Sequence, residues 1–186
     1  MESPDITILD RIIRSRRSVE RFRSEPPPRE AVLRALDAAR WAPNHRLTEP
    51  WRFYLLSHDS ARAVVELNAE LVLRKKGEEA AAQKRERWGG IPGWLVVTCA
   101  KSDHALQQRE DYAACCCATY AVLLALQAQG IGTKWSTGDV IRDPRFYEIL
   151  WADPTVEEVV GLVWYGYPEE TPVSVRRPLS DVLIEV

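Results

Sequence analysis

The sequence of 186 residues lacks any apolar run long enough to cross a membrane. No stretch of about 18 apolar residues occurs in it, so we expect no membrane span. Residues 1–18, MESPDITILDRIIRSRRS, are charged and contain no apolar segment of signal-peptide length. The net charge is only −2, from 25 basic and 27 acidic residues, which gives no electrostatic reason to expect a nucleic-acid partner. We therefore expect a cytoplasmic protein without a membrane or nucleic-acid partner.

Several motifs that carry enzyme chemistry are also missing. The chain has no G-x-G-x-x-G and no G-x-x-x-x-G-K-[ST], which argues against a Rossmann dinucleotide site and a P-loop. Its three histidines, His45, His58 and His104, are scattered, and no Ser-His-Asp order or metal-ligand cluster can be assembled around them. We expect no resident metal. Basic and aromatic groups without an obvious nucleophile suggest that a cofactor does the chemistry.

The four cysteines do not form a recognisable motif. Cys99 stands alone, and the run Cys115, Cys116, Cys117 lacks C-x-x-C spacing. We interpret the run as small apolar filler on a buried helix, with a redox-active thiol as the alternative. Free cysteines are typical of a reducing cytoplasm.

What is present predicts one globular domain spanning residues 1–186. The composition, 46% hydrophobic and 28% charged, is that of an ordinary folded chain. Because helices and strands do not alternate strictly from the start, the pattern argues against a simple doubly wound sheet. Periodicity and boundary residues predict helices at about 5–15, 28–41, 60–87 with a break at Gly77, 110–129 and 143–150, strands at 51–57, 94–100, 133–136 and 158–165, and an extended tail at about 168–186.

Two segments near the N-terminus suit ligand binding. Arg16, Arg17 and Ser18 combine two fixed cations with a hydroxyl, which suits a phosphate. The alternative is that these cations complement the end of the first helix. The loop 41–51 contains Trp41, His45, Trp51 and two prolines, and we interpret it as a ligand wall.

A third segment, residues 130–138, runs from the long apolar helix through a short strand into a glycine turn. Its glycines allow backbone N–H groups to approach a ligand closely. The alternative is a helix C-cap followed by a turn. The loop does not lead directly into a helix N-terminus, so it is a weak signal for phosphate.

These segments together resemble the nitroreductase family of FMN-dependent oxidoreductases, and in length and in the Pro-x-His of the loop the chain is similar to the short NAD(P)H nitroreductases. The resemblance implies an α+β fold with a central, mostly antiparallel sheet wrapped by helices, in an intertwined homodimer with FMN at the interface. It implies ping-pong transfer from NADH or NADPH through flavin N5 to a nitroaromatic, quinone or similar acceptor. The matching strings are RRSVERF, AARWAPNHRLTEPWRFYLL, QGIGTKWSTG, and VVGLVWYGYP followed by VRRPL.

The resemblance also implies roles for individual residues. Arg16, Ser18 and Arg176 match groups that hold the FMN phosphate and ribityl chain, and Arg17 lies between the first two. Trp41 and His45 match a loop that reaches the flavin of the partner subunit. The segment beside the flavin ring comprises Trp135, Ser136, Thr137 and Gly138.

Four positions depart from the family pattern. Ser174 replaces a lysine of the phosphate clamp, so Arg177 is a candidate substitute. Glu20 replaces a basic flavin contact, for which Arg21 is the expected substitute. Ser136 replaces an arginine whose charge Lys134 could supply, and Glu49 replaces a glutamine.

Two other functions stay open at this point. The scaffold could serve reductive dehalogenation, enone reduction or flavin breakdown, which are reactions of enzymes with an ordered lid, for which the polar segment 77–88 is the candidate. A non-enzymatic FMN-binding protein is the second alternative. The seven tryptophans divide accordingly: Trp41, Trp51 and Trp135 are expected near flavin, Trp88 beside the lid, and Trp94, Trp151 and Trp164 in or beside the core.

Overall fold

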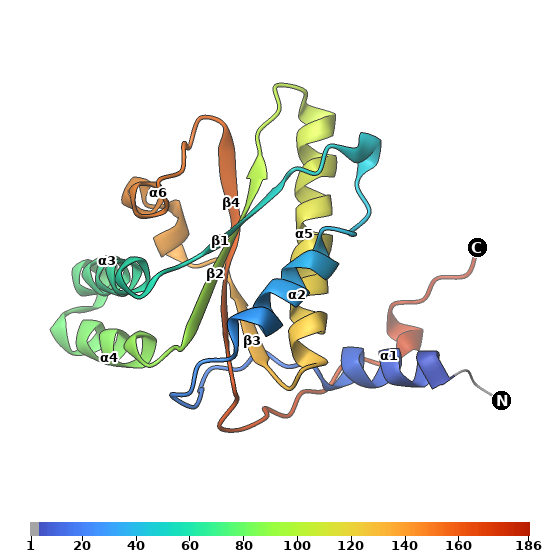
Figure 1. Cartoon of the computed structure of the whole chain (residues 1–186), viewed down its shortest axis with the longest axis horizontal. Coiled ribbons are helices and arrows are strands. Elements are labelled where there is room, and N and C mark those ends of the chain that lie inside the picture. The colour runs from blue at the N-terminus through green and yellow to red at the C-terminus, as the bar shows by residue number, and fades with distance from the viewer. Residues whose placement is uncertain (1–3) are drawn as a thin grey trace.

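The computed structural model describes residues 4–186 and has an α+β architecture (Figure 1). Every predicted helix and strand is present within a few residues of its expected bounds, and the predicted fold class is confirmed. The helices are α1 (Pro4–Ser15), α2 (Arg29–Ala39), α3 (His58–Lys76), α4 (Glu78–Gly89), α5 (Ala105–Gln127) and α6 (Pro144–Leu150); the strands are β1 (Trp51–Leu55), β2 (Gly93–Ala100), β3 (Gly132–Ser136) and β4 (Glu157–Gly166).

The four strands form one antiparallel sheet in the order β1-β2-β4-β3. The segment that follows α1 lies beside the edge strand β3, where Ser18 forms a parallel bridge with Thr133 and the Val19 N–H donates to the Thr133 carbonyl at 2.9 Å. This contact brings two of the three predicted ligand segments, residues 16–18 and 130–138, to the same edge of the sheet.

Local signals explain where several helices begin and end. The Ser57 hydroxyl caps α3, and Asp143 caps α6 with Pro144 in the first turn. Gly77 separates α3 from α4 with a φ of +86°, a left-handed conformation that favours glycine. The predicted break is therefore confirmed, and the polar segment 77–88 forms an ordered helix, α4, packed against α3.

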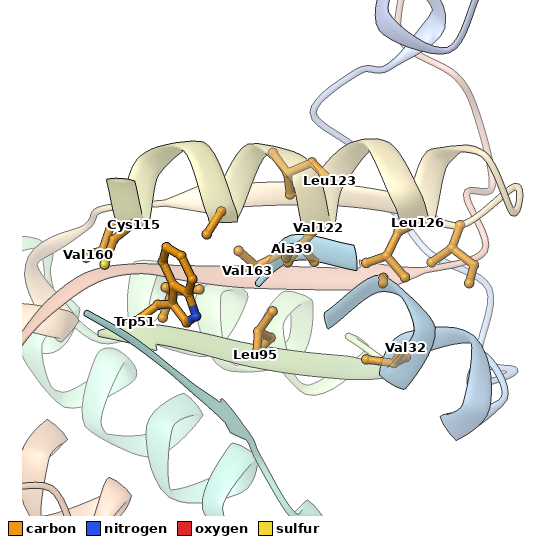
Figure 2. Packing of buried hydrophobic residues seen from close by; sticks show 14 of the residues in the cluster. Val32, Ala39, Trp51, Leu95, Cys115, Val122, Leu123, Leu126, Val160 and Val163 are labelled. Carbon is orange, nitrogen blue, oxygen red and sulfur yellow. The ribbon is translucent and has the colours of Figure 1, made fainter. Parts of the chain in front are cut away.

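Helices cover both faces of the sheet, with α2 and α5 on one face and α3, α4 and α6 on the other (Figure 1). Each face has its own hydrophobic cluster. The α5-side cluster contains mostly small aliphatic side chains, including Leu95, Val122 and Leu126 (Figure 2). The α3-side cluster contains Trp88, Trp94 and Trp164, whose ring centroids lie 5.1 to 5.8 Å apart.

Helix α5 is buried on one side only, which corrects the expectation of a helix buried all round. Cys115 is fully buried, Cys116 is half-buried and Cys117 is exposed. Successive helical residues turn by about 100°, so a run of three cannot share one environment. The interpretation as buried filler is confirmed for Cys115 and is wrong for Cys117. Burial and a hydrogen bond with Cys99 raise the pKa of the Cys115 thiol, which argues against reactivity at this position.

Trp151 also differs from its prediction. It was expected in or beside the core, but its side chain is 95% exposed. Trp151 ends α6 in the left-handed conformation, with a φ of 55°, and this places it outside both clusters.

The two ends of the described chain are weakly buried. Helix α1 contains no buried residue, and its apolar side chains Ile6, Leu9 and Ile13 are between 41% and 51% exposed. The tail is extended, as predicted, apart from one short turn at Leu179–Asp181, and it runs on the same side of the molecule as α1 (Figure 1). None of the helices within residues 4–186 is long and apolar enough to cross a membrane.

Candidate functional site

A cavity of about 260 Å³ lies on the α3-side of the sheet, next to β3. Four lysines line it, and Asp139 is the one acidic residue among its lining groups, so we call it the lysine cavity. Its polar and aromatic wall is formed by Asn68 on α3, Lys75, Lys76, Lys84 and Trp88 around the α3–α4 pair, and Lys134, Ser136, Gly138, Asp139 and Trp164 from the sheet and the turn after it.

Three residues that line this cavity contribute buried donors without partners. The side-chain nitrogens Asn68 Nδ2, Trp88 Nε1 and Trp164 Nε1 have no hydrogen-bond acceptor among residues 4–186. The three residues are only 8%, 5% and 2% exposed. A buried polar group without a partner costs about 1–3 kcal/mol, so these three donors are free to bond with acceptor atoms of a ligand or of water in the cavity. Three further buried atoms without partners in the described chain, Arg17 Nε, Thr133 Oγ1 and Trp135 Nε1, belong to residues that do not line it.

The charges around the cavity are positive and only partly neutralised. Lys75 pairs with Asp139 at 2.7 Å, whereas Lys84 has no carboxylate partner in the described chain. Burial lowers the pKa of Lys84, and the nearby charges of Arg87 and Lys134 lower it further. The cavity is therefore suited to a ligand that carries negative charge or many acceptor atoms.

Lys134 is held in the wall by two contacts. Its ammonium lies 4.9 Å from the centroid of the Trp164 ring, a cation–π contact. The same ammonium donates to the Glu20 carboxylate at 2.5 Å, and Glu20 also pairs with Arg87 of α4. The hydrogen bond from Lys134 is the main cause that lowers the pKa of Glu20. Glu20 is therefore charged and paired at neutral pH.

A second cavity of about 770 Å³ adjoins the first across this ion pair. It lies between the segment 18–22, helix α4 and the start of the tail, and Ser18, Arg21 and Arg87 are among its lining residues. Glu20 lines this second cavity, whereas its partner Lys134 lines the lysine cavity. Arg21, the expected substitute for Glu20, is therefore on the wall of the second cavity only.

The structure places the residues of the predicted ring segment on two faces of β3. Ser136 and Gly138 line the lysine cavity, and Thr137 between them is exposed. Trp135 packs instead against the α5-side cluster, where its indole nitrogen lies over Gly161. Because side chains alternate along a strand, Trp135 faces away from Lys134 and Ser136. Within one chain the Trp135 side chain thus packs on the face opposite the lysine cavity, its buried Nε1 has no acceptor within residues 4–186, and its role in cofactor binding stays a prediction.

Trp51 likewise lies on the α5 side of the sheet. Its side chain is 9% exposed and belongs to the α5-side cluster (Figure 2). Trp164, expected to need only a packing explanation, lines the lysine cavity together with Trp88.

Arg16 and Arg17 behave differently from each other. The Arg17 guanidinium donates to the carbonyls of Arg14 at 2.5 Å and Arg16 at 2.9 Å. Arg17 thus complements the end of α1, which is the alternative that the sequence left open. Arg16 is half-buried, and its side chain makes no hydrogen bond or ion pair within residues 4–186. Arg17 Nε is also buried and has no acceptor within residues 4–186, so both arginines keep donors that a ligand can accept from.

The predicted ligand-wall loop lies apart from the lysine cavity within one chain. Trp41 is 80% exposed at the end of α2, and His45 is exposed in a short turn that contacts α5. Figure 1 shows this loop near the start of α5, on the face of the sheet opposite α3 and α4. The chain by itself does not bring Trp41 or His45 to the cavity.

This loop is nevertheless held in a defined and strained shape. Arg46, Leu47 and Glu49 have φ values of 59°, 52° and 44°, which side chains other than glycine rarely adopt. The Thr48 hydroxyl donates to the buried Asp111 carboxylate of α5 at 2.5 Å, which fixes the loop. Strain of this kind persists where the surrounding structure enforces it, and it clusters at functional sites.

Arg176 lies in the exposed tail and is not brought to the cavity. Its guanidinium donates to the hydroxyl of Ser174 and to the Val175 carbonyl. Ser174, which stands where the family pattern has a lysine of the phosphate clamp, therefore contacts Arg176. No contact joins Arg176 to Arg16 or Ser18 in the part of the chain that the structure describes.

Sequence reasoning missed Asn68 and Lys84. Asn68 occupies a buried position of α3 between Leu67 and Ala69, where an amide is costly without a partner. A polar residue within the apolar stripe of a helix was the available signal, but it does not distinguish a ligand contact from a satisfied core amide. Lys84 lies in a polar helix whose sequence shows no single buried face.

The chain is similar in sequence and in fold to known proteins. Residues 13–167 match the sequence pattern described as “Nitroreductase family”. A Bacillus subtilis protein named “Putative NAD(P)H nitroreductase YfhC” is 32% identical, with 97% of this chain and 95% of that protein covered. The structure of a nitroreductase-like family protein from Bacillus cereus matches with a TM-score of 0.84 and 27% identity, covering 96% of this chain and 95% of that one. A Desulfovibrio desulfuricans structure described as “a putative nitroreductase in complex with fmn” matches with a TM-score of 0.77 and 25% identity, covering 100% and 98%. The sequence match over most of the chain and the shared fold show that this protein belongs to the nitroreductase family.

Proposed function

We propose that this protein is an FMN-dependent oxidoreductase that takes electrons from NADH or NADPH and passes them to a nitroaromatic, quinone or similar acceptor. The observation that carries the proposal is the set of unpartnered donors and lysines around one cavity. An isoalloxazine ring presents several oxygen and nitrogen acceptors, and it gains negative charge on reduction. The lysine cavity offers the complementary groups, so the residues present fit this cofactor.

The cavities also suggest which residues hold each part of the cofactor. Asn68, Trp164 and Lys134 would face the ring, with Ser136 and the backbone at Gly138 beside them. Arg16 and Ser18, at the same sheet edge, would hold the phosphate. Arg176, on the extended tail, would join them. When bound, FMN supplies an atom that accepts and returns a hydride, which explains why the chain needs no nucleophile or dedicated general base.

The protein is proposed to work as a homodimer. Apolar side chains line one exposed face of α1, and Tyr112, Tyr120 and Cys117 lie on the exposed side of α5. The tail adds Val173, Val175 and Ile184, each at least 83% exposed. Exposed apolar stripes on two helices and a strand-like tail are suited to cover one another in a second copy. Trp41 and His45 would then reach the cavity of the other chain, which one chain alone does not achieve.

Flavin reduction under anaerobic conditions tests the function. The purified protein, supplied with FMN, should show the yellow flavin spectrum after gel filtration, and NADH or NADPH should bleach it. Addition of a nitroaromatic or a quinone should restore the oxidised spectrum. A protein that does not retain FMN would contradict the whole proposal. FMN that neither nicotinamide reduces would identify a flavin-binding protein without this activity, and reoxidation only by an enone or a halogenated substrate would identify a specialised enzyme.

A further inference from the structure

The ion pair between Lys134 and Glu20 joins the two cavities, whereas both members of the other ion pair at the lysine cavity, Lys75 and Asp139, line that cavity alone. Lys134 lines the lysine cavity, and its ammonium is held by the Trp164 ring. Glu20 lines the larger cavity and accepts from both Lys134 and Arg87. One carboxylate thus serves two cations that come from two different elements, β3 and α4.

Lys134 and Arg87 carry two positive charges, and the single negative charge of Glu20 cancels part of them. The Lys134 side chain is 23% exposed, compared with 48% for Glu20, so the ammonium is the more shielded partner. A charge that is partly shielded from water acts more strongly on a neighbouring ligand than an exposed one. The Glu20 carboxylate stays ionised because its pKa is lowered by these same two cations.

We propose that Glu20 partly compensates the charge of Lys134 and so sets how strongly Lys134 favours the reduced, negatively charged cofactor. This inference rests on the proposed function. Lys134 stabilises the negative charge that appears on reduction, and Glu20 cancels part of that stabilisation. The pair therefore tunes the reduction potential of the bound flavin, and with it the range of acceptors that can be reduced. The two members of the pair act in opposite directions, which makes their effects separable.

Midpoint potentials of bound FMN in matched variants test this inference. Lys134→Gln should weaken binding of reduced FMN about tenfold relative to oxidised FMN, which lowers the potential by about 30 mV for a two-electron couple. Glu20→Gln keeps the side-chain shape and should shift the potential upward. Glu66→Gln is the matched control, because Glu66 forms an exposed ion pair with Arg85 between α3 and α4 and does not line the lysine cavity. Its potential should equal that of the unaltered protein.

Each outcome decides the question. Opposite shifts for Lys134→Gln and Glu20→Gln, with Glu66→Gln unchanged, support the inference. A downward shift or no shift for Glu20→Gln overturns it, as does an unchanged potential in Lys134→Gln. Dissociation constants for oxidised FMN, measured on the same proteins, show whether the variants still bind the cofactor. Failure of the unaltered protein to bind FMN would count against the proposed function, whereas unshifted potentials in FMN-loaded variants would count against this inference alone.

Discussion

The two faces of the sheet are formed by the same strands but differ in the side chains that pack on them. Along β2, Leu95 and Val97 enter the α5-side cluster, whereas Trp94 and Val96 enter the α3-side cluster. The α5 side is filled by small aliphatic residues against a long helix (Figure 2). The α3 side carries bulky indoles beside a cavity rich in lysines. The comparison indicates that the α3 side combines a hydrophobic core with groups that suit a ligand.

The edge strand β3 shows this division within five residues. Trp135 packs toward the α5-side cluster, and Lys134 and Ser136 line the lysine cavity. A shift of one residue in the pairing of β3 would exchange these roles, because side chains alternate along a strand. The register of Trp135 with Val163 and the close fit of its indole over Gly161 hold the strand in place.

The largest expected effect on stability lies on the α5 side. Leu126 is fully buried in the α5-side cluster, so Leu126→Ala should lower the free energy of unfolding by about 3 kcal/mol through lost burial and a cavity. Urea denaturation at a fixed protein concentration measures this change. FMN affinity of the folded protein should stay within twofold or so, since Leu126 does not line either cavity.

Leu73→Ala is the control for this prediction. Leu73 lies on α3 and is 41% exposed, so its truncation should change the free energy of unfolding by no more than about 0.5 kcal/mol. Equal losses in Leu126→Ala and Leu73→Ala would contradict the assignment of Leu126 to the buried core.

The fold was accessible from the sequence because its signals are local. The apolar run at 94–100 and the glycine at position 77 predict the strand and the helix break that the structure contains. The proline at position 144 similarly predicts the start of α6. These features depend on nearest neighbours in the chain, and tertiary contacts did not override them.

The site could be predicted from the sequence only in part, because it depends on which face of the sheet each side chain points to. The sequence identified Ser136 and Gly138, which line the lysine cavity. Because residues 135–138 were predicted as one segment, the sequence did not show that Trp135 points to the opposite face. The partner of Glu20 was equally hidden, since Lys134 lies 114 positions away in the chain and meets it only through the bridge beside β3. Long-range pairing of this kind leaves no local pattern.

The two adjacent arginines at the end of α1 give the next largest expected effect, this time on the cofactor. Arg16→Ala should weaken FMN binding about thirtyfold, because a charge-assisted contact to a phosphate is worth about 2 kcal/mol. Arg17→Ala should weaken FMN binding less than Arg16→Ala and lower stability slightly, because one nitrogen of its guanidinium already serves the carbonyls at the end of α1. Fluorescence titration with FMN and thermal unfolding of each variant measure the two effects. Similar FMN affinities in the two variants would show that Arg16 does not hold the phosphate.

The smallest expected effect is at Asn68, and it tests the comparison of the two sheet faces most directly. It separates ligand binding from stability at one buried position. Asn68→Leu keeps nearly the same shape and removes an amide whose nitrogen has no partner within residues 4–186. The FMN-free protein should be as stable as before or slightly more stable, since no hydrogen bond is lost from that nitrogen and its desolvation cost disappears. FMN binding should nevertheless weaken about tenfold, because the acceptor on the ligand then faces a methyl group.

Thr98→Val provides the opposite pattern and serves as the matched control. The fully buried Thr98 hydroxyl donates to the buried Glu157 carboxylate, so its removal leaves a charged acceptor with one partner fewer. Stability should fall by about 1–3 kcal/mol, while FMN affinity should not change. A loss of stability in Asn68→Leu equal to that in Thr98→Val would mean that the Asn68 amide is part of the core. Slightly higher stability of the FMN-free protein combined with weaker FMN binding would mean that the α3 face keeps an unpaired donor, at a cost to the empty protein, because the ligand completes it.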